Sequence, residues 1–451
     1  MRQILQNTAE RASRYLESLE SRPVFPTPEA LNRLAALDTP IPDHPESPEQ
    51  TLAALDEYAS PATVGMAGSR YFGFVIGGSL PAALAANWLA GAWDQNAGLY
   101  VASPSASVLE DIAGRWLLDV LGLPETAGFG FVTGATMANF TGLAAARHKV
   151  LADQGWNVEA DGLFGAPPIT VIVGDEVHIS LLKALSLLGF GAQRIVRVPV
   201  DSQGRIRADA FPEIAGPTIV CLQAGNVNTG ACDPLADIIP RARAAGAWVH
   251  IDGAFGLWAG AAPDRAALVQ GIADADSWAT DGHKWLNVPY DSGLVFVRDP
   301  EMLRAAMNYN AAYLVRSDSR DPFQYTPELS RRARGIEVWA AMRSLGRSGI
   351  ADLIERCCRH AARFAEGLSA AGYNILNDVA LNQVLVSFGD SETTKQVIAA
   401  VQQEGTCWAG GTLWQGHTAM RISVSSWATT AEDVEQSLEA IIKVANSITH
   451  P

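Results

Sequence analysis

The feature that most restricts the fold of this chain is a series of short, continuously apolar runs between residues 127 and 300. Turns and helical stretches separate these runs, which are rich in β-branched side chains. Apolar runs without alternation are typical of strands covered on both faces, and helices between them favour right-handed crossovers. The pattern predicts an α/β fold with a mostly parallel seven-stranded sheet, built from GFGFV, ITVIVGDE, RIVRVPV, PTIVCLQAG, AWVHIDGA, SWATD and SGLVFV.

The sequence on either side of this region has a different character. Residues 1–72 hold helix-like pieces and a connector rich in proline, which excludes one continuous helix. Beyond residue 335 a long helical stretch precedes alternating strand-like and helix-like segments, which predicts a small α+β C-terminal domain. We therefore expect an N-terminal segment over 1–72, a large domain over 73–334 and a small domain over 335–451. The apolar positions of the N-terminal segment need burial, so we expect it to pack on a partner subunit.

The composition argues against several classes of partner. Of the 451 residues, 48% are hydrophobic, and the formal net charge is −15 without any basic run. Nucleic acid and anionic membranes attract positive surfaces, so neither is an expected partner. The N-terminal residues lack the apolar stretch of a signal peptide, and the most apolar window is too short to span a bilayer. We expect a cytoplasmic protein whose five cysteines are reduced, mostly buried thiols, and no metal site.

A lysine at the end of one apolar run is the first candidate for chemistry. Lys284 stands in SWATDGHKWLNVPYDSG, where a strand-like run leads into turn-forming residues. A partly desolvated lysine loses its proton readily, and the neutral amine adds to carbonyl groups. Lys284 is therefore a candidate for a Schiff base, although a lone lysine in such a place is more commonly an exposed loop residue.

Two further candidates follow the first and second runs. Gly134, Ala135 and Thr136 form a small-residue turn between a predicted strand and helix, where backbone N–H groups and the positive end of the helix favour an anion. His178 follows the second run, and its imidazole can stack on a flat ring or relay a proton. Structural interpretations stay open for both: a tight turn and a core or capping histidine.

The fourth candidate is an aspartate at the end of an apolar strand. An unpaired carboxylate at Asp252 would be costly, so it needs a cation, and a protonated pyridine nitrogen would serve. Ala254, two residues on, is small enough to let such a ring lie flat. The alternative is an aspartate that caps a helix. Together with the turn, the histidine and the lysine, this residue completes the four parts that hold pyridoxal phosphate.

The order of these residues resembles the pyridoxal-phosphate-dependent group II amino-acid decarboxylases, which include the aromatic-L-amino-acid, histidine and glutamate decarboxylases. The most specific motif is HIDGAFG followed by DGHKW, and the resemblance extends from ASPSASVLE through the C-terminal domain. It implies the aspartate-aminotransferase-like architecture of the PLP-dependent transferases, fold type I. It also implies an intertwined homodimer with composite active sites.

The resemblance further implies a role for each candidate residue. Lys284 would form the imine with pyridoxal phosphate, and Asp252 would pair with the pyridine nitrogen. His178 would stack on the ring, and His283 would lie near the phosphate. The phosphate itself would be held by Gly134, Ala135 and Thr136.

Two segments depart from the family pattern. QAGNVNTGACDP places Asn226 and Asn228 where hydroxyl side chains are usual, and we expect Asn228 to contact the cofactor. In MNYNAAYLVRSDSRDPFQYTPE no tyrosine stands at the usual place of the family's proton donor. Tyr313 and Tyr325 are the available substitutes.

The expected reaction is decarboxylation of an L-amino acid to the amine and carbon dioxide. Arg421, in AMRISV, can hold an α-carboxylate through its guanidinium, although a surface ion pair is an equal alternative. Tyr71 and Phe72 favour an aromatic or apolar substrate side chain. An aminotransferase or an oxidative, aldehyde-forming enzyme would use the same cofactor residues, so both stay open, as does a non-catalytic scaffold.

Overall fold

A computed structural model describes residues 1–309 and 319–449 of the chain. Internal contacts divide it into two units. The sheet unit comprises Ser79–Ala361 and Asn377–Gln383, and the terminal unit comprises Met1–Gly78, Ala362–Leu376 and Val384–Pro451. Both ends of the chain thus contribute to one unit. The division expected at residues 72 and 334, with the first segment on a partner subunit, stays a prediction.

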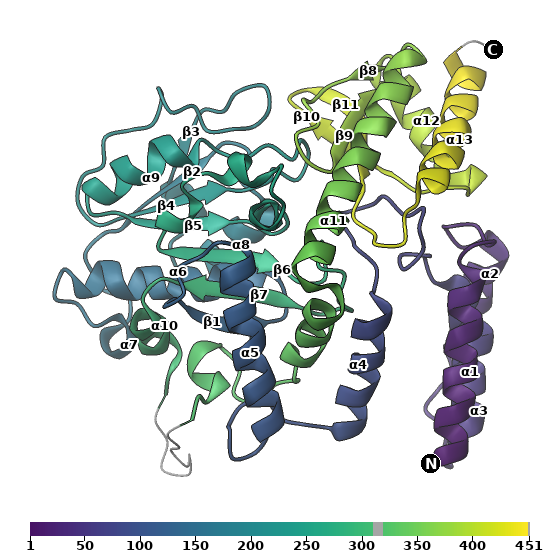
Figure 1. Cartoon of the computed structure of the whole chain (residues 1–451), viewed down its shortest axis with the longest axis horizontal. Helices are drawn as coiled ribbons and strands as arrows, with labels where there is room; N and C mark the ends of the chain where they lie inside the picture. Colours follow the sequence, from purple (N-terminus) through teal and green to yellow (C-terminus); the bar gives the residue numbers. More distant parts are fainter. Residues whose placement is uncertain (310–318, 450–451) are drawn as a thin grey trace. The chain divides into compact units, whose positions relative to one another are not determined.

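The sheet unit contains the predicted sheet (Figure 1). In the described residues its seven strands lie in the order β1-β7-β6-β5-β4-β2-β3. Neighbours from β6 to β3 are parallel, whereas β7 runs antiparallel to both β6 and β1. All seven predicted runs are strands, namely β1 (Gly128–Val132), β2 (Thr170–Gly174), β3 (Ile195–Val198), β4 (Thr218–Gln223), β5 (Trp248–Asp252), β6 (Ser277–Asp281) and β7 (Gly293–Val297).

The reversed direction of β7 follows from its connection to β6. Parallel neighbours need a long crossover, usually through a helix, whereas antiparallel neighbours can be joined by a short loop. Residues 282–292 contain no helix, and the chain turns back so that Asp281 pairs with Gly293. This loop, which carries Lys284, therefore connects the carboxyl end of β6 directly to the start of β7.

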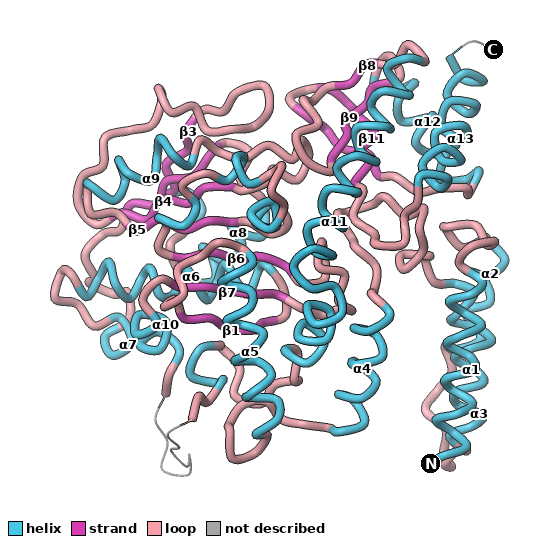
Figure 2. The backbone as a smooth tube through the Cα atoms, in the orientation of Figure 1, coloured by secondary structure: helices cyan, strands magenta, loops and turns pink. Residues whose placement is uncertain are grey.

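Helices surround this sheet, as the cyan and magenta segments of Figure 2 show. α6 lies against several strands, and α8 and α10 pack on α6. Alanines make up much of the buried surface of α6, which permits a close approach to the strands. The helices of the unit are α4 (Pro81–Trp93), α5 (Pro104–Val120), α6 (Ala135–Ala152), α7 (Val158–Asp161), α8 (Ile179–Leu187), α9 (Leu235–Ala244) and α10 (Pro300–Met307).

The terminal unit combines a small sheet with helices from both ends of the chain. Its strand order is β10-β11-β9-β8. The N-terminal part is tied to the C-terminal part by backbone bonds from Val24 N to Gly405 O (3.0 Å) and from Phe72 N to Trp408 O (2.8 Å). The elements are α1 (Arg2–Ser18), α2 (Pro28–Arg33), α3 (Pro48–Ala54), β8 (Asn374–Ile375), β9 (Gln383–Ser387), α12 (Ser391–Glu404), β10 (Gly410–Trp414), β11 (His417–Ser423) and α13 (Ala431–Thr449).

The predicted small α+β domain is confirmed, with two additions. β8 and β10 were not predicted from the sequence, because one is very short and the other begins with two glycines. The expected long helix is α11 (Gly335–Ala370), but its residues 335–361 belong to the sheet unit, and Gly346 interrupts it with a φ of 61°. The five cysteines are buried free thiols, as expected. Among the described helices, none combines the length and apolar character that crossing a bilayer requires.

Candidate active site

Lys284 lies three residues beyond the end of β6 and is mostly buried. Its side chain is 17% exposed, and Nζ lies 3.2 Å from Oδ2 of Asp281. The alternative interpretation, an exposed lysine on a loop, is therefore wrong. A lysine that is partly desolvated at the end of a strand is a candidate for an amine nucleophile.

Asp281 is the site residue that sequence reasoning missed next to Lys284. It is the last residue of β6 and almost fully buried. Its Oδ1 accepts the N–H of Ala135 at 2.6 Å, at the beginning of α6, where a helix favours negative charge. The signal was available, since Asp281 belongs to the DGHKW motif and ends an apolar strand in the same way as Asp252.

His283 presents a neutral N–H at the same turn. Its Nδ1 accepts the N–H of Ser292 at 3.1 Å, so the hydrogen belongs on Nε2, which lies 3.5 Å from Oδ2 of Asp281. Burial lowers the pKa of His283, and the nearby Asp281 carboxylate opposes that shift. The ring stacks on Tyr290 with centroids 4.2 Å apart. The structure therefore brings His283 and Lys284 together around Asp281.

The predicted anion-binding turn lies beside this group. Gly134 is the residue before α6, and a Cβ at Gly134 would lie 3.3 Å from Cε1 of His283. A Cβ at Gly293 would lie 2.4 Å from Cα of Gly134, so this close backbone contact requires glycine at position 293. The N–H of Ala135 is engaged by Asp281, and Thr136 lies in the first turn of α6.

Asp252 is a buried carboxylate that receives only neutral donors from the described residues. Its Oδ1 accepts the N–H of Ala254 at 3.2 Å, and its Oδ2 accepts Nδ2 of Asn139 at 3.1 Å. None of the ion pairs between described residues involves Asp252. The helix-cap alternative is wrong, because the next helical segment, Gly256–Ala261, has Phe255 at its N-cap position.

The sheet brings Asp252 near the Lys284 loop. β5 and β6 are parallel neighbours in which Asp252 pairs with Ala279, and the N–H of Asp281 donates to Ala254 O at 2.9 Å. Their carboxyl ends share one edge of the sheet, the usual place for sites in such folds. A buried carboxylate suited to a cation and a buried amine suited to a carbonyl thus meet the two chemical requirements of a pyridine aldehyde.

Two other predicted residues follow β2 and β4. His178 is the N-cap of α8: its Nδ1 accepts the N–H of Ser180 at 3.2 Å. The capping interpretation is confirmed, and ring stacking stays a prediction. Asn228 is buried in the turn after β4, where its N–H donates to Oδ1 of Asn226 at 2.9 Å. This turn therefore uses asparagine at positions where the family that the sequence resembles usually has hydroxyl side chains.

Tyr71 and Arg421 lie within electrostatic reach of each other in the terminal unit. Burial raises the pKa of Tyr71 to about 12, against the effect of Arg421. Burial also lowers the pKa of Arg421, with Tyr71 opposing the shift. Tyr71 stacks on Trp408, which sequence reasoning missed, at a centroid distance of 5.2 Å. Phe72 is fully buried against Phe364, so its side chain belongs to the core of this unit.

Of the two candidate proton donors, the structure describes Tyr325 but not Tyr313. Tyr325 ends a short helix, Pro322–Tyr325, and its ring centroid lies 4.4 Å from the guanidinium carbon of Arg320. Arg320 in turn pairs with the buried Glu110 at 3.0 Å. Tyr313 lies outside the described residues.

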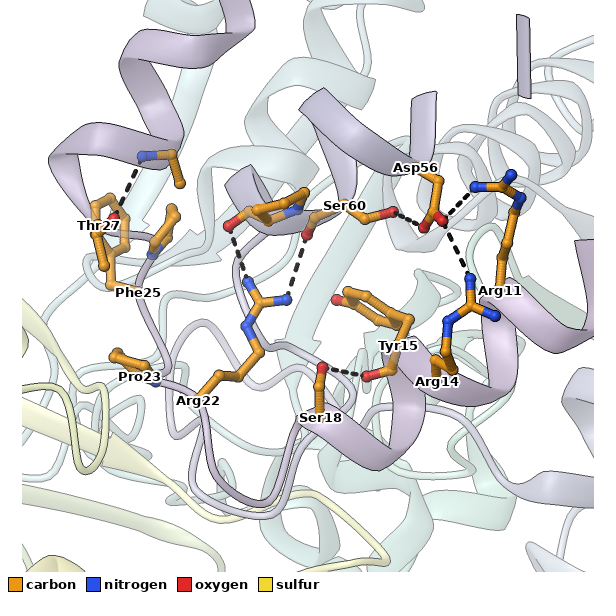
Figure 3. Close-up of a pocket in the computed structure, with 13 residues that line it drawn as sticks. Arg11, Arg14, Tyr15, Ser18, Arg22, Pro23, Phe25, Thr27, Asp56 and Ser60 are labelled. Carbon is orange, nitrogen blue, oxygen red and sulfur yellow. Dashed lines mark hydrogen bonds and ion pairs between the residues drawn. The ribbon is translucent and has the colours of Figure 1, made fainter. Parts of the chain in front are cut away.

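A hollow of about 400 Å³ in the terminal unit has a different character. Figure 3 shows Arg11 and Arg14 directed at Asp56, while Arg22 donates to the carbonyl oxygens of Ser60 and Pro61. Its lining contains no lysine or histidine. With its arginines in structural contacts, this hollow offers no acid–base or carbonyl chemistry.

Two relatives resemble the chain along nearly its whole length. The aromatic-L-amino-acid decarboxylase of Bacillus atrophaeus is 26% identical over 480 residues, which cover 100% of this chain and 97% of the relative. The phenylacetaldehyde synthase of Arabidopsis thaliana is 25% identical, over 97% of this chain and 94% of its own.

Solved structures confirm the predicted fold. The crystal structure of Oryza sativa TDC with PLP and tryptamine matches with a TM-score of 0.91 at 24% identity, over 99% of this chain and 97% of that one. The model of the pyridoxal-dependent decarboxylase conserved domain matches residues 28–389. Because this match takes in most of the chain and includes Asp252 and Lys284, the chain belongs to the pyridoxal-dependent decarboxylases, amino-acid carboxy-lyases whose cofactor is pyridoxal phosphate.

Proposed function

We propose that this enzyme converts an aromatic L-amino acid to its amine and carbon dioxide. The observation that carries the proposal is that two reactive residues follow neighbouring strands at the same edge of the sheet. Asp252 is a buried carboxylate with neutral donors, and Lys284 is a mostly buried amine. The aromatic preference is supported by the similarity to an aromatic-L-amino-acid decarboxylase.

Each residue has a distinct task in this proposal. Pyridoxal phosphate, when bound, supplies an electron sink for the electrons released with carbon dioxide. Lys284 would hold the cofactor through its side-chain amine. Asp252 keeps a proton on the ring nitrogen, His178 covers the ring, and Ala254 leaves space for it. The cofactor's remaining contacts would be Asn228, His283, Gly134, Ala135 and Thr136.

The substrate contacts rest on chemistry within the terminal unit. Arg421 is the proposed partner of the α-carboxylate, since a guanidinium forms two parallel hydrogen bonds with that group. Tyr71, stacked on Trp408, contributes an aromatic surface with a hydroxyl. Burial raises the pKa of Tyr71 to about 12, which favours the protonated hydroxyl.

Aldehyde formation is the second candidate, favoured by the similarity to a phenylacetaldehyde synthase. In both reactions carbon dioxide leaves first. In the decarboxylase a proton then adds to the substrate carbon, and we propose that Tyr313 or Tyr325 of a second subunit supplies it. In the synthase dioxygen takes two electrons instead and becomes hydrogen peroxide, and water releases the aldehyde and ammonia. The products therefore separate the two functions.

The test is product analysis with a panel of aromatic and other L-amino acids. We expect carbon dioxide and amine in equal amounts from an aromatic substrate, no turnover by Lys284→Ala, and loss of the visible band of the lysine-bound cofactor in that variant. Tyr313→Phe or Tyr325→Phe should raise the share of aldehyde.

Three results would contradict the proposal. Undiminished turnover by Lys284→Ala would remove the whole assignment. Aldehyde with hydrogen peroxide as the main wild-type products would favour the synthase. Wild-type product ratios in both tyrosine variants would place the proton donor elsewhere, with His178 the next residue to replace.

We also propose a cytoplasmic homodimer. α1, α2 and α3 contain no buried residue in this chain, although their apolar side chains need cover. A second copy that packs on these helices would provide it.

A further inference from the structure

A chain of hydrogen bonds runs through the interior of the sheet unit and ends at Asp252. Nε1 of Trp248 donates to Oγ of Ser277 at 2.8 Å, and that Oγ lies 2.8 Å from Nδ1 of His250. Nε2 of His250 lies 2.8 Å from Oδ1 of Asn139, whose Nδ2 reaches Oδ2 of Asp252 at 3.1 Å. All of these side chains are buried, so water does not compete for their polar atoms.

Donors and acceptors fit together when every hydrogen bond in this chain points toward Asp252. An indole N–H can only donate, so Ser277 accepts from Trp248. Burial lowers the pKa of His250 to about 3, so the ring is neutral and one nitrogen carries the hydrogen. If Ser277 donates to Nδ1, then Nε2 donates to Asn139, and Asn139 donates to Asp252. Every group is satisfied when Asp252 only accepts hydrogen bonds.

The opposite direction leaves one group unsatisfied. For a protonated Asp252 to donate to Asn139, the amide of Asn139 would have to be turned over, so that its oxygen faces Asp252 and its Nδ2 donates to Nε2 of His250. Nδ1 of His250 would then donate to Ser277. Ser277 already accepts from Trp248, and these two residues are its hydrogen-bond partners in the described part of the chain. Its own hydroxyl hydrogen would then lack an acceptor. A buried donor without a partner is costly. This series of hydrogen bonds therefore favours a charged Asp252.

α6 is built to permit this arrangement. Asn139 and Gly142 are three residues apart and therefore lie on the same face of the helix. A Cβ at Gly142 would lie 3.0 Å from Cε1 and 3.2 Å from Nδ1 of His250. Because glycine has no side chain, the His250 ring can lie against the helix and reach Asn139.

We propose that Asn139, His250 and Ser277 are positioning residues that hold Asp252 charged and oriented for the pyridine nitrogen of pyridoxal phosphate. The inference rests on the role proposed above for Asp252. It adds that the protonation of the cofactor ring depends on side chains that lie one to three hydrogen bonds behind that carboxylate.

The experiment is ¹⁵N NMR of the holoenzyme loaded with pyridoxal phosphate that carries ¹⁵N in its ring, since the resonance separates a protonated from a neutral pyridine. Ser277→Ala and Asn139→Leu should both move the resonance toward the neutral position. Each should also weaken binding of pyridoxal phosphate to the apoprotein by about tenfold, the effect of one lost hydrogen bond. Ser277→Thr keeps the hydroxyl and should restore the wild-type resonance.

Thr141→Val is the matched control. Thr141 is fully buried on the same helix, but its hydroxyl donates to Met137 O at 2.7 Å and takes no part in the chain. This variant should keep the wild-type resonance and affinity while it loses a comparable buried hydrogen bond. Unfolding temperatures of all variants show whether a change in resonance merely follows a loss of stability.

Asp252→Asn serves as the reference variant, because it distinguishes failure of this inference from failure of the role proposed for Asp252. If it moves the resonance while Ser277→Ala and Asn139→Leu leave it in place, the inference is wrong and the role of Asp252 stands. If Asp252→Asn itself leaves the resonance unchanged, the proposed role of Asp252 fails, and the inference with it. Should Asn139→Leu not fold, Ser277→Ala decides alone, because it removes only one oxygen atom.

Discussion

At the scale of single residues, two buried aspartates at neighbouring strand ends have opposite surroundings. Asp281 has the Lys284 ammonium and the beginning of α6 as partners. Asp252 has the amide of Asn139 and one backbone N–H. The first is already compensated by a cation of the chain, whereas the second is suited to a cation from outside. This difference, rather than burial alone, supports the proposal that Asp252, and not Asp281, pairs with the cofactor.

His250 should make the enzyme sensitive to acid through its burial. Its pKa falls from 6.5 to about 3, so the unfolded chain takes up a proton first. The stability that neutral His250 contributes is complete above pH 6.5 and is lost as the pH falls toward 3. Between pH 7 and pH 5 this residue should lower the free energy of unfolding by roughly 2 kcal/mol. Urea unfolding of the wild type and of His250→Gln at both pH values measures this loss.

Other buried acids act on the same measurement and must be separated from His250. Burial raises the pKa of Asp233 to about 6, so its contribution to stability is present in acid and is lost as the pH rises from 3.8 through 6. Wild type and variant share this effect, so their difference isolates the histidine. Equal losses in both proteins would show that His250 is not neutral in the folded state.

At the scale of elements, the approach of β7 to the start of α6 sets the geometry of the site. Gly293 pairs with Val132 on β1 and with Asp281 on β6. A Cβ at Gly293 would meet the Cα, C and N atoms of Gly134 at 2.4 to 2.5 Å. Backbone atoms cannot turn aside as a side chain can, so the strand or the turn would have to move.

We therefore expect Gly293→Ala to lower the free energy of unfolding by about 3 kcal/mol, near the upper end for overpacking. Its affinity for pyridoxal phosphate should fall as well, because the displaced turn carries Gly134. Gly91→Ala is the matched control: Gly91 lies in α4 with no atom within 4 Å of its Cβ position. That variant should gain about 0.5–1 kcal/mol, since alanine suits a helix better. Similar urea midpoints for both variants would contradict the argument.

The strands and the reactive residues could be predicted from the sequence, but their network could not. Seven apolar runs gave seven strands, because buried strands need continuous apolar surface. Lys284 and Asp252 could be identified because a lysine or an aspartate after such a run needs a chemical reason. Asn139 has no such local signal: its importance comes from Asp252, 113 residues away, and from His250, 111 residues away. Contacts of that range depend on strand order, which local patterns do not specify.

At the scale of the whole molecule, the N-terminal helices carry apolar side chains on their outer surface. Leu34 and Leu55, which directly follow α2 and α3, are 36% and 50% exposed. If a second copy covers this surface, a charge there must be buried without a partner, which is costly. We expect the double variant Leu34→Glu, Leu55→Glu to sediment as a monomer where the wild type sediments as a dimer.

Phe164→Ser is the control for this prediction, because Phe164 is 97% exposed in the sheet unit and lies far from these helices in the sequence. It should leave the sedimentation coefficient unchanged. A monomeric wild type would remove the proposed homodimer, and a dimeric double variant would place its interface on another surface.

The terminal unit, made from both ends of the chain, also has a consequence for the order of events during synthesis. Arg70 donates to the carbonyl oxygen of Thr406, a partner that the ribosome adds 336 residues later. At roughly 5–20 residues per second, the N-terminal helices wait roughly 20 to 70 s for the strands and helices that complete their unit. During that time the sheet unit between them can fold, while the leucines of the first helices stay open to chaperones or to a neighbouring nascent chain.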